Sequence, residues 1–413
     1  MMDYGCIGEH LPHSFSKEIH EKIGAYPYEL KELTPQEVPA FMTRKAFSGI
    51  NVTIPYKQTV IPFLDVISPE AEAIGAVNTV VNRNGRLYGY NTDFTGMCQL
   101  LARMGLEPKG KKILILGSGG TSRTADAVLR ALHADEVIKV GRTRKQGVIT
   151  YEDALRLHTD ADLIVNTTPC GMYPDLFAQP IGLDRFTRLT GVLDAVYNPL
   201  RTRLVSEALR RNLKAQGGLY MLVAQAVAAF EILTDEKAPE GKSEQIFTEL
   251  YSEKQNIVLI GMPGSGKSTV GSLLAQRLGR PFVDTDDLIV QIAGSDIPTI
   301  FERQGEAVFR RLEKEVIASV SARSGCIIAT GGGAVLDPDN IAALKMNGRV
   351  SFLDRPLELL LPTADRPLAS TREAIEQRYR ERYSLYCAAA DDIIKVESDP
   401  SVPAEEILRS HQR

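Results

Sequence analysis

The sequence has no tryptophan, and only 6 of its 413 residues are histidine and 5 are cysteine. The cysteines are scattered and form no Cys-x-x-Cys pair, so we expect reduced thiols in a cytoplasmic protein. They are Cys6, Cys98, Cys170, Cys326 and Cys387. His10 and His13 have a spacing that a metal could use, but no further histidine or cysteine cluster completes a site. A turn is the simpler interpretation of that pair.

The sequence also has a small net charge and few long apolar runs. The net charge of -4 offers no basic field for nucleic acid, so we expect no such partner. The best candidate for a membrane segment, MLVAQAVAAF, is interrupted by Gln225 and is shorter than the about 18 apolar residues of a span. The first residues carry neither a basic region nor a long apolar segment, so we expect no export signal and no membrane partner.

What is present is a regular alternation of strand and helix patterns. A length of 413 residues predicts about two to three domains. Apolar runs such as KKILILG, DLIVNTT and NIVLIG, each followed by turn residues, are typical of parallel strands buried on both faces. The charged stretch 235–255 contains Pro239 and Gly241, which favours a linker with one short amphipathic helix. The apolar positions of that helix are Ile246, Phe247, Leu250 and Tyr251.

A glycine-rich turn follows the first of these strands, in KKILILGSGGTSR. Gly117, Gly119 and Gly120 permit a tight turn, and the next helix would present free amides to a pyrophosphate. The third glycine of the usual dinucleotide pattern is replaced by Ser122, so an ordinary strand-to-helix turn is the alternative.

The end of the next strand indicates which dinucleotide would bind. An NAD-selective fold places Asp or Glu there, whereas this chain has Arg142, Thr143 and Arg144. Arginine binds phosphate in a bidentate, permanently charged geometry, so the pattern favours the 2′-phosphate of NADP. A solvated basic turn is the alternative.

Polar clusters also end several strand-like runs upstream, in HSFS, NVTIPYK, GAVNTV and GYNTD. Each cluster alone fits a capped turn. Together they offer hydroxyls and amides for a polyhydroxylated substrate, with Lys57 and Asp93 available for proton transfer.

On these motifs, residues 1 to about 235 resemble the shikimate dehydrogenase family. The resemblance implies reversible hydride transfer between NADPH and the keto group of 3-dehydroshikimate, with Lys57 and Asp93 as the catalytic pair. The substrate-binding residues that it implies are Ser14, Ser16, Asn51, Thr53, Lys57, Asn78, Asp93, Tyr197 and Gln225. The NADP-binding residues are Gly117, Gly119, Gly120, Thr121, Arg142, Thr143, Arg144, Thr168 and Met172. The chain departs from the family pattern at Lys17 and Gly141.

A second glycine-rich loop, GMPGSGKST, lies between an apolar strand and a helix, which is the context that a P-loop requires. Its backbone amides would hold the phosphates of ATP, Lys267 would span the β- and γ-phosphates, and Ser268 would bind Mg²⁺. The ATP-binding residues predicted here are Gly261, Gly264, Ser265, Gly266, Lys267, Ser268 and Thr269.

Downstream residues indicate the acceptor of the phosphate. Asp284 and Asp286 lie at the end of a predicted strand. Because they are two residues apart, both would lie on one side of an extended chain. One carboxylate would then lie near Mg²⁺ and the other near a hydroxyl of the acceptor. A helix N-cap would explain either residue alone. Arg310 adds a cation to this set of residues. The glycines of ATGGGAV would let a ligand touch the backbone, although a tight turn also explains such glycines.

Residues 255 to about 395 thereby resemble shikimate kinase. The family pattern implies that Asp286 orients the hydroxyl, that Asp284 acts through Mg²⁺-bound water, and that Arg366 on a lid reaches the γ-phosphate. The substrate-binding residues that it implies are Asp286, Arg310, Gly331, Gly332, Gly333 and Arg382. The lid lacks an earlier arginine that many members direct at the adenine, and Ser384 stands at a usual proline position.

These patterns predict a bifunctional α/β enzyme that uses NADP(H), ATP and Mg²⁺ on 3-dehydroshikimate and shikimate, as a monomer or a homo-oligomer. The predicted domains are a shikimate-binding α/β domain (1–106, completed by 218–235), a Rossmann-like NADP domain (107–217), a linker (236–254) and a P-loop kinase domain with a parallel sheet (255–413). The alternatives are a quinate dehydrogenase joined to another small-molecule kinase and a non-catalytic sensor built on these folds.

Overall fold

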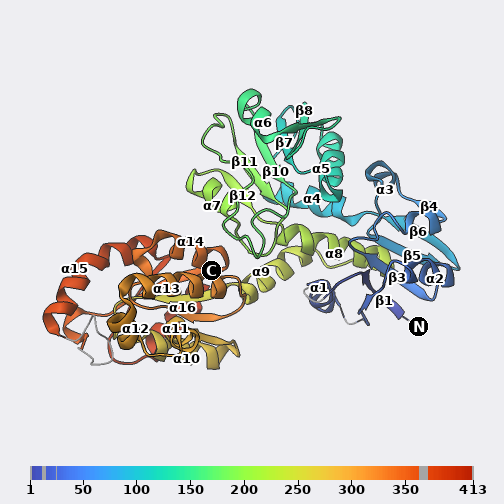
Figure 1. The fold of residues 1–413 in the computed structure, drawn as a ribbon. Helices are drawn as coiled ribbons and strands as arrows, with labels where there is room; N and C mark the ends of the chain where they lie inside the picture. The colour runs from blue at the N-terminus through green and yellow to red at the C-terminus, as the bar shows by residue number, and fades with distance from the viewer. Residues whose placement is uncertain (1, 12–14, 25, 362–370, 412–413) are drawn as a thin grey trace. The chain divides into compact units, whose positions relative to one another are not determined.

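The computed structural model describes residues 2–11, 15–24, 26–361 and 371–411 of the chain. Its contacts divide the chain into two compact units. The first comprises Met1–Met172, Ala178–Asn198 and Thr202–Glu249, and the second comprises Tyr173–Phe177, Pro199–Arg201 and Leu250–Arg413. Each unit is built from helices and mainly parallel sheets, as the alternating sequence pattern predicts (Figure 1).

The first sheet of unit 1 has the strand order β2-β1-β3-β5-β6-β4. It mixes parallel pairs around β1 with antiparallel pairs between β3, β5 and β6. Its strands are β1 (Met2–Gly8), β2 (Glu29–Glu32), β3 (Phe47–Val52), β4 (Val66–Ile67), β5 (Thr79–Arg83) and β6 (Arg86–Tyr90), and its helices are α1 (Ser16–Ile23), α2 (Glu37–Arg44), η1 (Ile61–Phe63) and α3 (Pro69–Ile74). Ile7, Ile50 and Val80 belong to its buried core.

The second sheet of unit 1 is parallel throughout, in the order β12-β11-β10-β7-β8-β9. Its strands are β7 (Lys112–Leu116), β8 (Glu136–Gly141), β9 (Val148–Thr150), β10 (Leu163–Asn166), β11 (Gly191–Asp194) and β12 (Lys214–Gln216), and its helices are α5 (Gly120–Ala131), α6 (Tyr151–Leu157) and α7 (Arg203–Arg210). The apolar run 113–116 is fully buried, as a central parallel strand requires. This is the predicted Rossmann-like arrangement.

Two long helices, α4 (Thr92–Arg103) and α8 (Leu219–Thr234), pack tightly against each other in unit 1. A Cβ at Gly96 of α4 would lie 2.6 Å from the carbonyl oxygen of Met221 and 2.9 Å from Cβ of Gln225 in α8. Only glycine permits this approach. The close contact brings Gln225 beside the N-terminal turn of α4, which carries Asp93.

The amphipathic helix predicted in the stretch 235–255 is present as α9 (Lys242–Lys254), with Ile246 and Leu250 fully buried. The Phe247 ring packs on Tyr220 of α8, with a centroid distance of 5.4 Å. Arg103 at the end of α4 donates two hydrogen bonds of 2.8 Å to the Glu244 carboxylate. The start of this helix is therefore fixed to the two helices that carry site residues.

Unit 2 contains a parallel sheet in the order β14-β15-β13-β16-β17. Its strands are β13 (Asn256–Ile260), β14 (Phe282–Asp284), β15 (Ile327–Ala329), β16 (Gly348–Asp354) and β17 (Asp392–Lys395). Its helices are α10 (Lys267–Leu278), α11 (Thr285–Ala293), α12 (Ile297–Gln304), α13 (Glu306–Ser321), η2 (Ala334–Leu336), α14 (Pro338–Asn347), η3 (Leu357–Leu359), α15 (Arg372–Ala389) and α16 (Ser401–His411). Loops that follow parallel strands meet at one edge of the sheet, where ligands bind in such folds.

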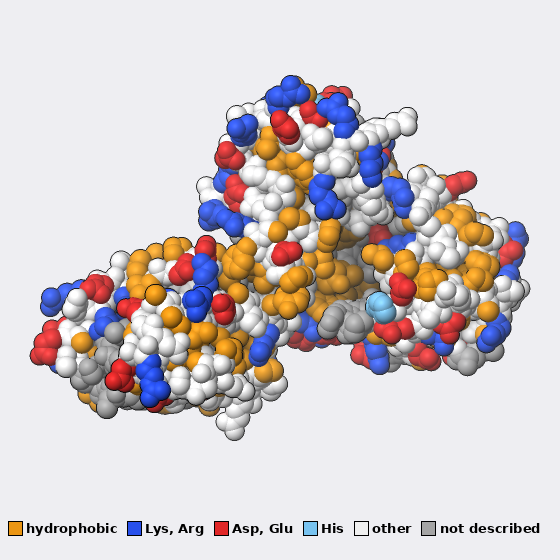
Figure 2. Space-filling model, in the orientation of Figure 1, with side chains coloured by type: hydrophobic (Ala, Val, Ile, Leu, Met, Phe, Trp, Pro, Cys, Tyr) orange, Lys and Arg blue, Asp and Glu red, His pale blue; other side chains and the backbone are white. Residues whose placement is uncertain are grey.

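Charged side chains of both signs are interspersed over the face that Figure 2 shows, in keeping with the small net charge. Cys6, Cys98, Cys326 and Cys387 have free thiols. Among the described residues, no helix has both the length and the apolar character that crossing a bilayer requires.

Candidate active sites

The two residues predicted as the dehydrogenase catalytic pair are in direct contact. Lys57 Nζ donates a 2.6 Å hydrogen bond to Asp93 Oδ2, and both side chains are partly buried. Lys57 lies in the turn after β3, and Asp93 lies in the first turn of α4. Both line a cavity of about 300 Å³ that also includes Gly120 and Thr121 at the start of α5. A proton donor and the predicted dinucleotide loop therefore share one cavity.

A buried network of amides and hydroxyls lies beside this pair. Asn51 Nδ2 donates to Thr79 Oγ1 at 3.0 Å, and Asn78 Oδ1 accepts from the backbone N–H of Thr92 at 2.8 Å. Thr92 Oγ1 in turn donates to Gln225 Oε1 at 3.2 Å. The structure thus brings together three predicted substrate residues from β3, the loop before β5 and α8. Thr79 and Thr92 were not predicted.

Behind Asn51 lies an aromatic cluster that the sequence did not reveal. Tyr28 donates its hydroxyl hydrogen to Asn51 Oδ1 at 2.7 Å, so the amide group of Asn51 has a defined orientation. The ring of His20 stacks on Tyr28 with centroids 3.9 Å apart and is hydrogen-bonded to the Tyr26 hydroxyl. Burial lowers the pKa of His20 to about 3, so this imidazole is neutral at physiological pH.

Other predicted substrate residues surround the same region. Ser16 begins α1, and Thr53 follows β3, where its backbone N–H donates to Ile7 O at 3.0 Å. The ring of Phe15, next to Ser16, lies 5.5 Å from the ring of Tyr197. Burial raises the pKa of Tyr197, so its hydroxyl stays protonated. Ser14 lies outside the described residues.

The predicted dinucleotide loop joins β7 to α5 as expected. Gly117 has φ of 114°, and a Cβ there would lie 2.6 Å from Thr167 Oγ1, so this position requires glycine. Gly119 is the N-cap of α5, and a Cβ at Gly119 or Gly120 would meet open space. Ser122, which replaces the third glycine, donates its hydroxyl hydrogen to Gly117 O at 2.8 Å and closes the loop.

The basic residues after β8 differ in their surroundings. Arg142, Thr143 and Arg144 are all exposed, but Arg144 also donates a 2.6 Å hydrogen bond to Asp153 Oδ2. Hydrogen bonds from Thr150 and Arg144 hold the pKa of the Asp153 carboxyl well below its usual value. Asp153 was not predicted, because its contact with Arg144 depends on the fold of β9 and α6.

The loop 166–172, which carries the predicted NADP-binding residues Thr168 and Met172, is held by a buried acid. Asp194, at the end of β11 and fully buried, accepts hydrogen bonds from Asn166 Nδ2 at 2.9 Å and from the Thr202 hydroxyl at 2.7 Å. Asn166 Oδ1 accepts from the Thr168 hydroxyl at 2.7 Å. Burial raises the pKa of Asp194 to about 6. Met172 is exposed at the end of this loop.

In unit 2, β13 leads into the predicted P-loop, and α10 begins at Lys267. Gly261, Gly264 and Gly266 have φ of 148°, 81° and 93°, which other residues rarely adopt. Lys267 Nζ donates to the carbonyl oxygens of Gly261 and Met262 at 2.9 and 3.0 Å. The loop therefore has the curvature and the cation that phosphate binding needs.

Asp284 and Asp286 lie differently from the prediction. Asp284 is the last strand residue and the N-cap of α11, whereas Asp286 already belongs to that helix. Their placement along one side of an extended chain was wrong, because the chain turns helical at Thr285. Asp284 Oδ1 accepts from the Asp286 N–H at 3.0 Å, and Asp284 Oδ2 accepts from the Ser268 hydroxyl at 2.8 Å. The predicted metal pair, Ser268 and Asp284, is therefore in contact.

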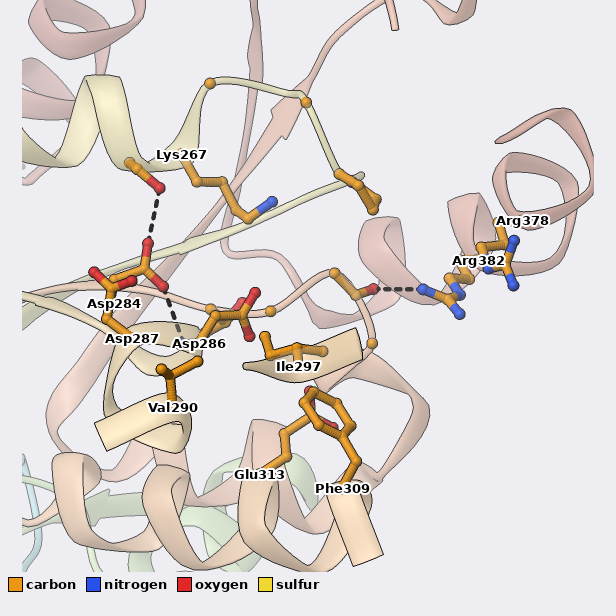
Figure 3. A pocket seen from close by; sticks show the side chains of 18 of the residues that line it. Lys267, Asp284, Asp286, Asp287, Val290, Ile297, Phe309, Glu313, Arg378 and Arg382 are labelled. Carbon is orange, nitrogen blue, oxygen red and sulfur yellow. Dashed lines mark hydrogen bonds between the residues drawn. The ribbon is translucent and has the colours of Figure 1, made fainter. Parts of the chain in front are cut away.

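A cavity of about 520 Å³ opens between the P-loop and these acids (Figure 3). Asp286, Arg310 and Glu313 line it together with the three glycines after β15. A Cβ at Gly331 would lie 2.5 Å from Asp286 Oδ1, and a Cβ at Gly333 would clash directly with Arg310 Nη1. The glycines therefore let these side chains approach the backbone.

Glu313 is a residue of this cavity that the sequence did not single out. Its side chain is almost fully buried and accepts a 2.9 Å hydrogen bond from Arg310 Nη1. Burial raises the pKa of Glu313, and the neighbouring Arg310 opposes that shift. Arg310 and Glu313 lie three positions apart on one helix, and this spacing could have indicated their contact. The same spacing, however, also fits an ordinary surface pair.

The remaining cations come from α15 and from the end of β16. Arg382 Nη1 donates to Gly332 O at 3.0 Å, as Figure 3 shows, and the buried Tyr386 donates its hydroxyl hydrogen to the same oxygen. Arg355 and Arg378 also line the cavity and were not predicted. Arg366 lies outside the described residues.

Comparisons with known proteins separate the two parts of the chain. Family models for the shikimate dehydrogenase substrate-binding domain and the shikimate 5′-dehydrogenase C-terminal domain match residues 6–80 and 218–242, and a shikimate kinase model matches residues 263–412. The NADP-dependent shikimate dehydrogenases of Clostridium perfringens and Geobacillus kaustophilus are each 36% identical to this chain, over 60% of it and 97% of their own length.

Solved structures agree with this division. A chorismate mutase/shikimate 5-dehydrogenase fusion protein from Clostridium acetobutylicum matches with 35% identity and a TM-score of 0.57, over 60% of this chain and 97% of that one. Shikimate 5-dehydrogenase from Thermus thermophilus, in complex with NADP(H) and shikimate, matches with 32% identity and a TM-score of 0.54, over 60% and 99% of the two chains. The chain therefore belongs to the shikimate dehydrogenase family and continues, over residues 263–412, into a shikimate kinase domain.

Proposed function

We propose that this chain catalyses two consecutive reactions on one ring. Unit 1 reduces 3-dehydroshikimate to shikimate with NADPH, and unit 2 phosphorylates shikimate with ATP to shikimate 3-phosphate. The contact between Lys57 and Asp93, in a cavity shared with the dinucleotide loop, carries the first assignment. The P-loop facing Asp286, Arg310 and Arg382 across one cavity supports the second.

In the reduction, NADPH supplies the hydride that adds to the keto carbon. Lys57 Nζ donates a proton to the oxygen that becomes the hydroxyl, and Asp93 Oδ2 holds the ammonium in position and accepts from a neighbouring ring hydroxyl. Asn51 and Asn78 bind ring hydroxyls from the adjoining network. The serines at 14 and 16 and the Tyr197 hydroxyl bind the substrate carboxylate and the outer edge of the ring.

The residues of the second sheet fit a 2′-phosphorylated dinucleotide. Open space beside Gly119 and Gly120 leaves room for a pyrophosphate at the N-terminus of α5. Arg142 is exposed at the end of β8, where a 2′-phosphate would lie. Thr168, held by Asn166, faces the nicotinamide from the neighbouring loop.

In the phosphoryl transfer, the chain positions two substrates in line. The P-loop amides and Lys267 hold the phosphates of ATP, and the Ser268 hydroxyl and Asp284 carboxylate form a pair of oxygen ligands suited to Mg²⁺. Mg²⁺ neutralises phosphate charge when bound. Asp286 orients the attacking hydroxyl of shikimate, Arg310 and Arg382 bind its carboxylate, and Arg366 stabilises charge on the transferred group.

A coupled assay tests both assignments on the full chain. NADPH oxidation with 3-dehydroshikimate and ADP release with added shikimate are measured for the wild type, Lys57→Ala and Lys267→Ala. We expect Lys57→Ala to lose the reduction and keep the phosphorylation, and Lys267→Ala to do the reverse. A variant that retained its own reaction would refute the corresponding site. 3-Dehydroquinate, offered with NADPH in place of 3-dehydroshikimate, tests the alternative of a quinate dehydrogenase.

A further inference from the structure

One arginine, Arg355, lies between the end of β16 and the lid residue Arg366 in the sequence. β16 pairs with β13 in parallel, with Phe352 opposite Ile260. The P-loop begins directly after Ile260, and Arg355 follows three residues after Phe352. Since both strands end at the same edge of the sheet, Arg355 emerges beside the P-loop.

The side chain of Arg355 is fixed against that loop. Its Nη1 donates a hydrogen bond of 3.2 Å to the carbonyl oxygen of Gly264, the middle glycine of the P-loop. The residue lines the same cavity as Lys267 and Ser268. Its Nε is shielded from solvent and has no hydrogen-bond partner among the described residues. A desolvated guanidinium nitrogen without an acceptor is unfavourable unless a ligand supplies one.

The charges around the cavity favour an anionic ligand on this side. Asp284 ends β14 and Asp286 lies in the helix after it, while Gly331, which closely approaches Asp286, follows β15. Both of these strands lie on one side of β13. β16 lies on the other side of β13, and Arg355 is the cation there that contacts the P-loop. A phosphate chain in the loop would therefore meet carboxylates on one flank and a guanidinium on the other.

From this geometry we propose that Arg355 binds the phosphate chain of the nucleotide, as a second cation of the P-loop beside Lys267. The proposal rests on the kinase function proposed above. Arginine suits the role because its planar guanidinium can keep the hydrogen bond to Gly264 O while its remaining N–H groups donate to phosphate oxygens. A nucleotide-binding cation then comes from the end of a sheet strand rather than from the lid.

Steady-state kinetics of full-length Arg355→Gln test the proposal, with Arg372→Gln as the matched control. Arg372 Nη1 also donates to a backbone carbonyl oxygen, that of Leu360 at 3.3 Å, but Arg372 does not belong to the lining of the described cavity. We expect Arg355→Gln to raise the KM for ATP by about tenfold or more, with little change in the KM for shikimate. Arg372→Gln should leave both constants unchanged.

Inhibition by inorganic tripolyphosphate identifies the part of the nucleotide that is bound. If Arg355 contacts phosphates, its replacement should weaken tripolyphosphate inhibition by the same factor as it raises the KM for ATP. An unchanged KM for ATP would overturn the proposal, and so would a raised KM with unchanged tripolyphosphate inhibition, which would assign Arg355 to the base or ribose.

Direct binding of ATP, measured by calorimetry without an acceptor, separates this proposal from the kinase assignment. Wild-type protein that bound ATP but did not phosphorylate shikimate would refute the proposed function alone. Equal ATP affinity of the wild type and Arg355→Gln in that measurement would refute the role of Arg355 alone. Circular dichroism and thermal unfolding of each variant establish that it is folded.

Discussion

Lys57 and Asp93 are separated by 36 positions in the sequence, yet Lys57 Nζ lies 2.6 Å from Asp93 Oδ2. The lysine follows a strand of the first sheet, and the aspartate lies in the first turn of the helix that leads toward the second sheet. The pair is therefore formed by the packing of α4, which Gly96 and α8 fix in place.

Replacement of Asp93 by asparagine should disable the reduction. Asn keeps the shape of the side chain but removes the charge that holds the Lys57 ammonium, so we expect kcat for NADPH oxidation to fall by about 10²- to 10⁴-fold. Phosphorylation of added shikimate should be unchanged. Asp65→Asn is the control, since Asp65 forms a 3.2 Å ion pair with Lys45 in the same domain but outside the cavity. Similar losses in the two variants would contradict the catalytic role.

Tyr28→Phe tests whether the aromatic cluster orients Asn51. Loss of the 2.7 Å hydrogen bond would leave the Asn51 amide held only through its Nδ2 group and less firmly oriented, so the KM for 3-dehydroshikimate should rise by about fivefold, with kcat little changed. Tyr26→Phe also removes a hydroxyl from this cluster, but one that contacts His20 rather than Asn51. Equal effects of the two changes would indicate a general loss of packing.

Local motifs predicted much of these sites, because a glycine turn or a P-loop needs its residues to be adjacent in sequence. The residues that were missed act through contacts across the fold. Tyr28, which precedes β2, meets Asn51 of β3, and Arg355, which follows β16, meets Gly264 in the loop after β13. A buried tyrosine or a single arginine has no distinctive spacing, so a single sequence carries no signal for either role. The error at Asp286 had a local cause, since the helix began one residue after Asp284.

Gly333→Ala should impair shikimate binding without unfolding the kinase. The new Cβ would clash with Arg310 Nη1, and this flexible guanidinium can move only by leaving its position in the cavity. We expect the KM for shikimate to rise by about tenfold or more, with the KM for ATP nearly unchanged. Gly294→Ala is the control for backbone strain, because its φ is 63° but no atom lies within 4 Å of the new Cβ. An effect of equal size in both variants would contradict the steric explanation.

The two arginines after β8 should contribute unequally to cofactor choice. Arg142 is exposed, so Arg142→Ala should raise the KM for NADPH by about tenfold or more and leave that for NADH nearly unchanged. Arg144→Ala should have a smaller effect, since Asp153 already neutralises that guanidinium. Steady-state kinetics with both cofactors decide the matter. An equal loss of NADPH and NADH in Arg142→Ala would exclude a role in binding the 2′-phosphate.

The raised pKa of Asp194 predicts that the stability of the second sheet of unit 1, which holds the cofactor loop, depends on pH. Burial raises its pKa from 3.8 to about 6, so between these values the folded protein keeps a proton that the unfolded chain releases. The stabilising contribution of this proton is complete below the unfolded pKa and is lost as the pH rises through about 6, a change on the order of 3 kcal/mol. Above that pH the buried carboxylate is charged and depends on its donors, Asn166 and Thr202.

Asp194→Asn provides the matched neutral side chain for this prediction. The measurement is hydrogen exchange of peptides that cover β10 and β11. Comparing the wild type with the variant at each pH cancels the intrinsic pH dependence of exchange. Near pH 4.5 the wild type should be best protected relative to the variant, because the folded Asp194 is then still largely neutral. As the pH rises to 7.5, protection of the wild type should fall relative to that of the variant. A constant difference across this range would show that the Asp194 carboxyl does not titrate with a raised pKa.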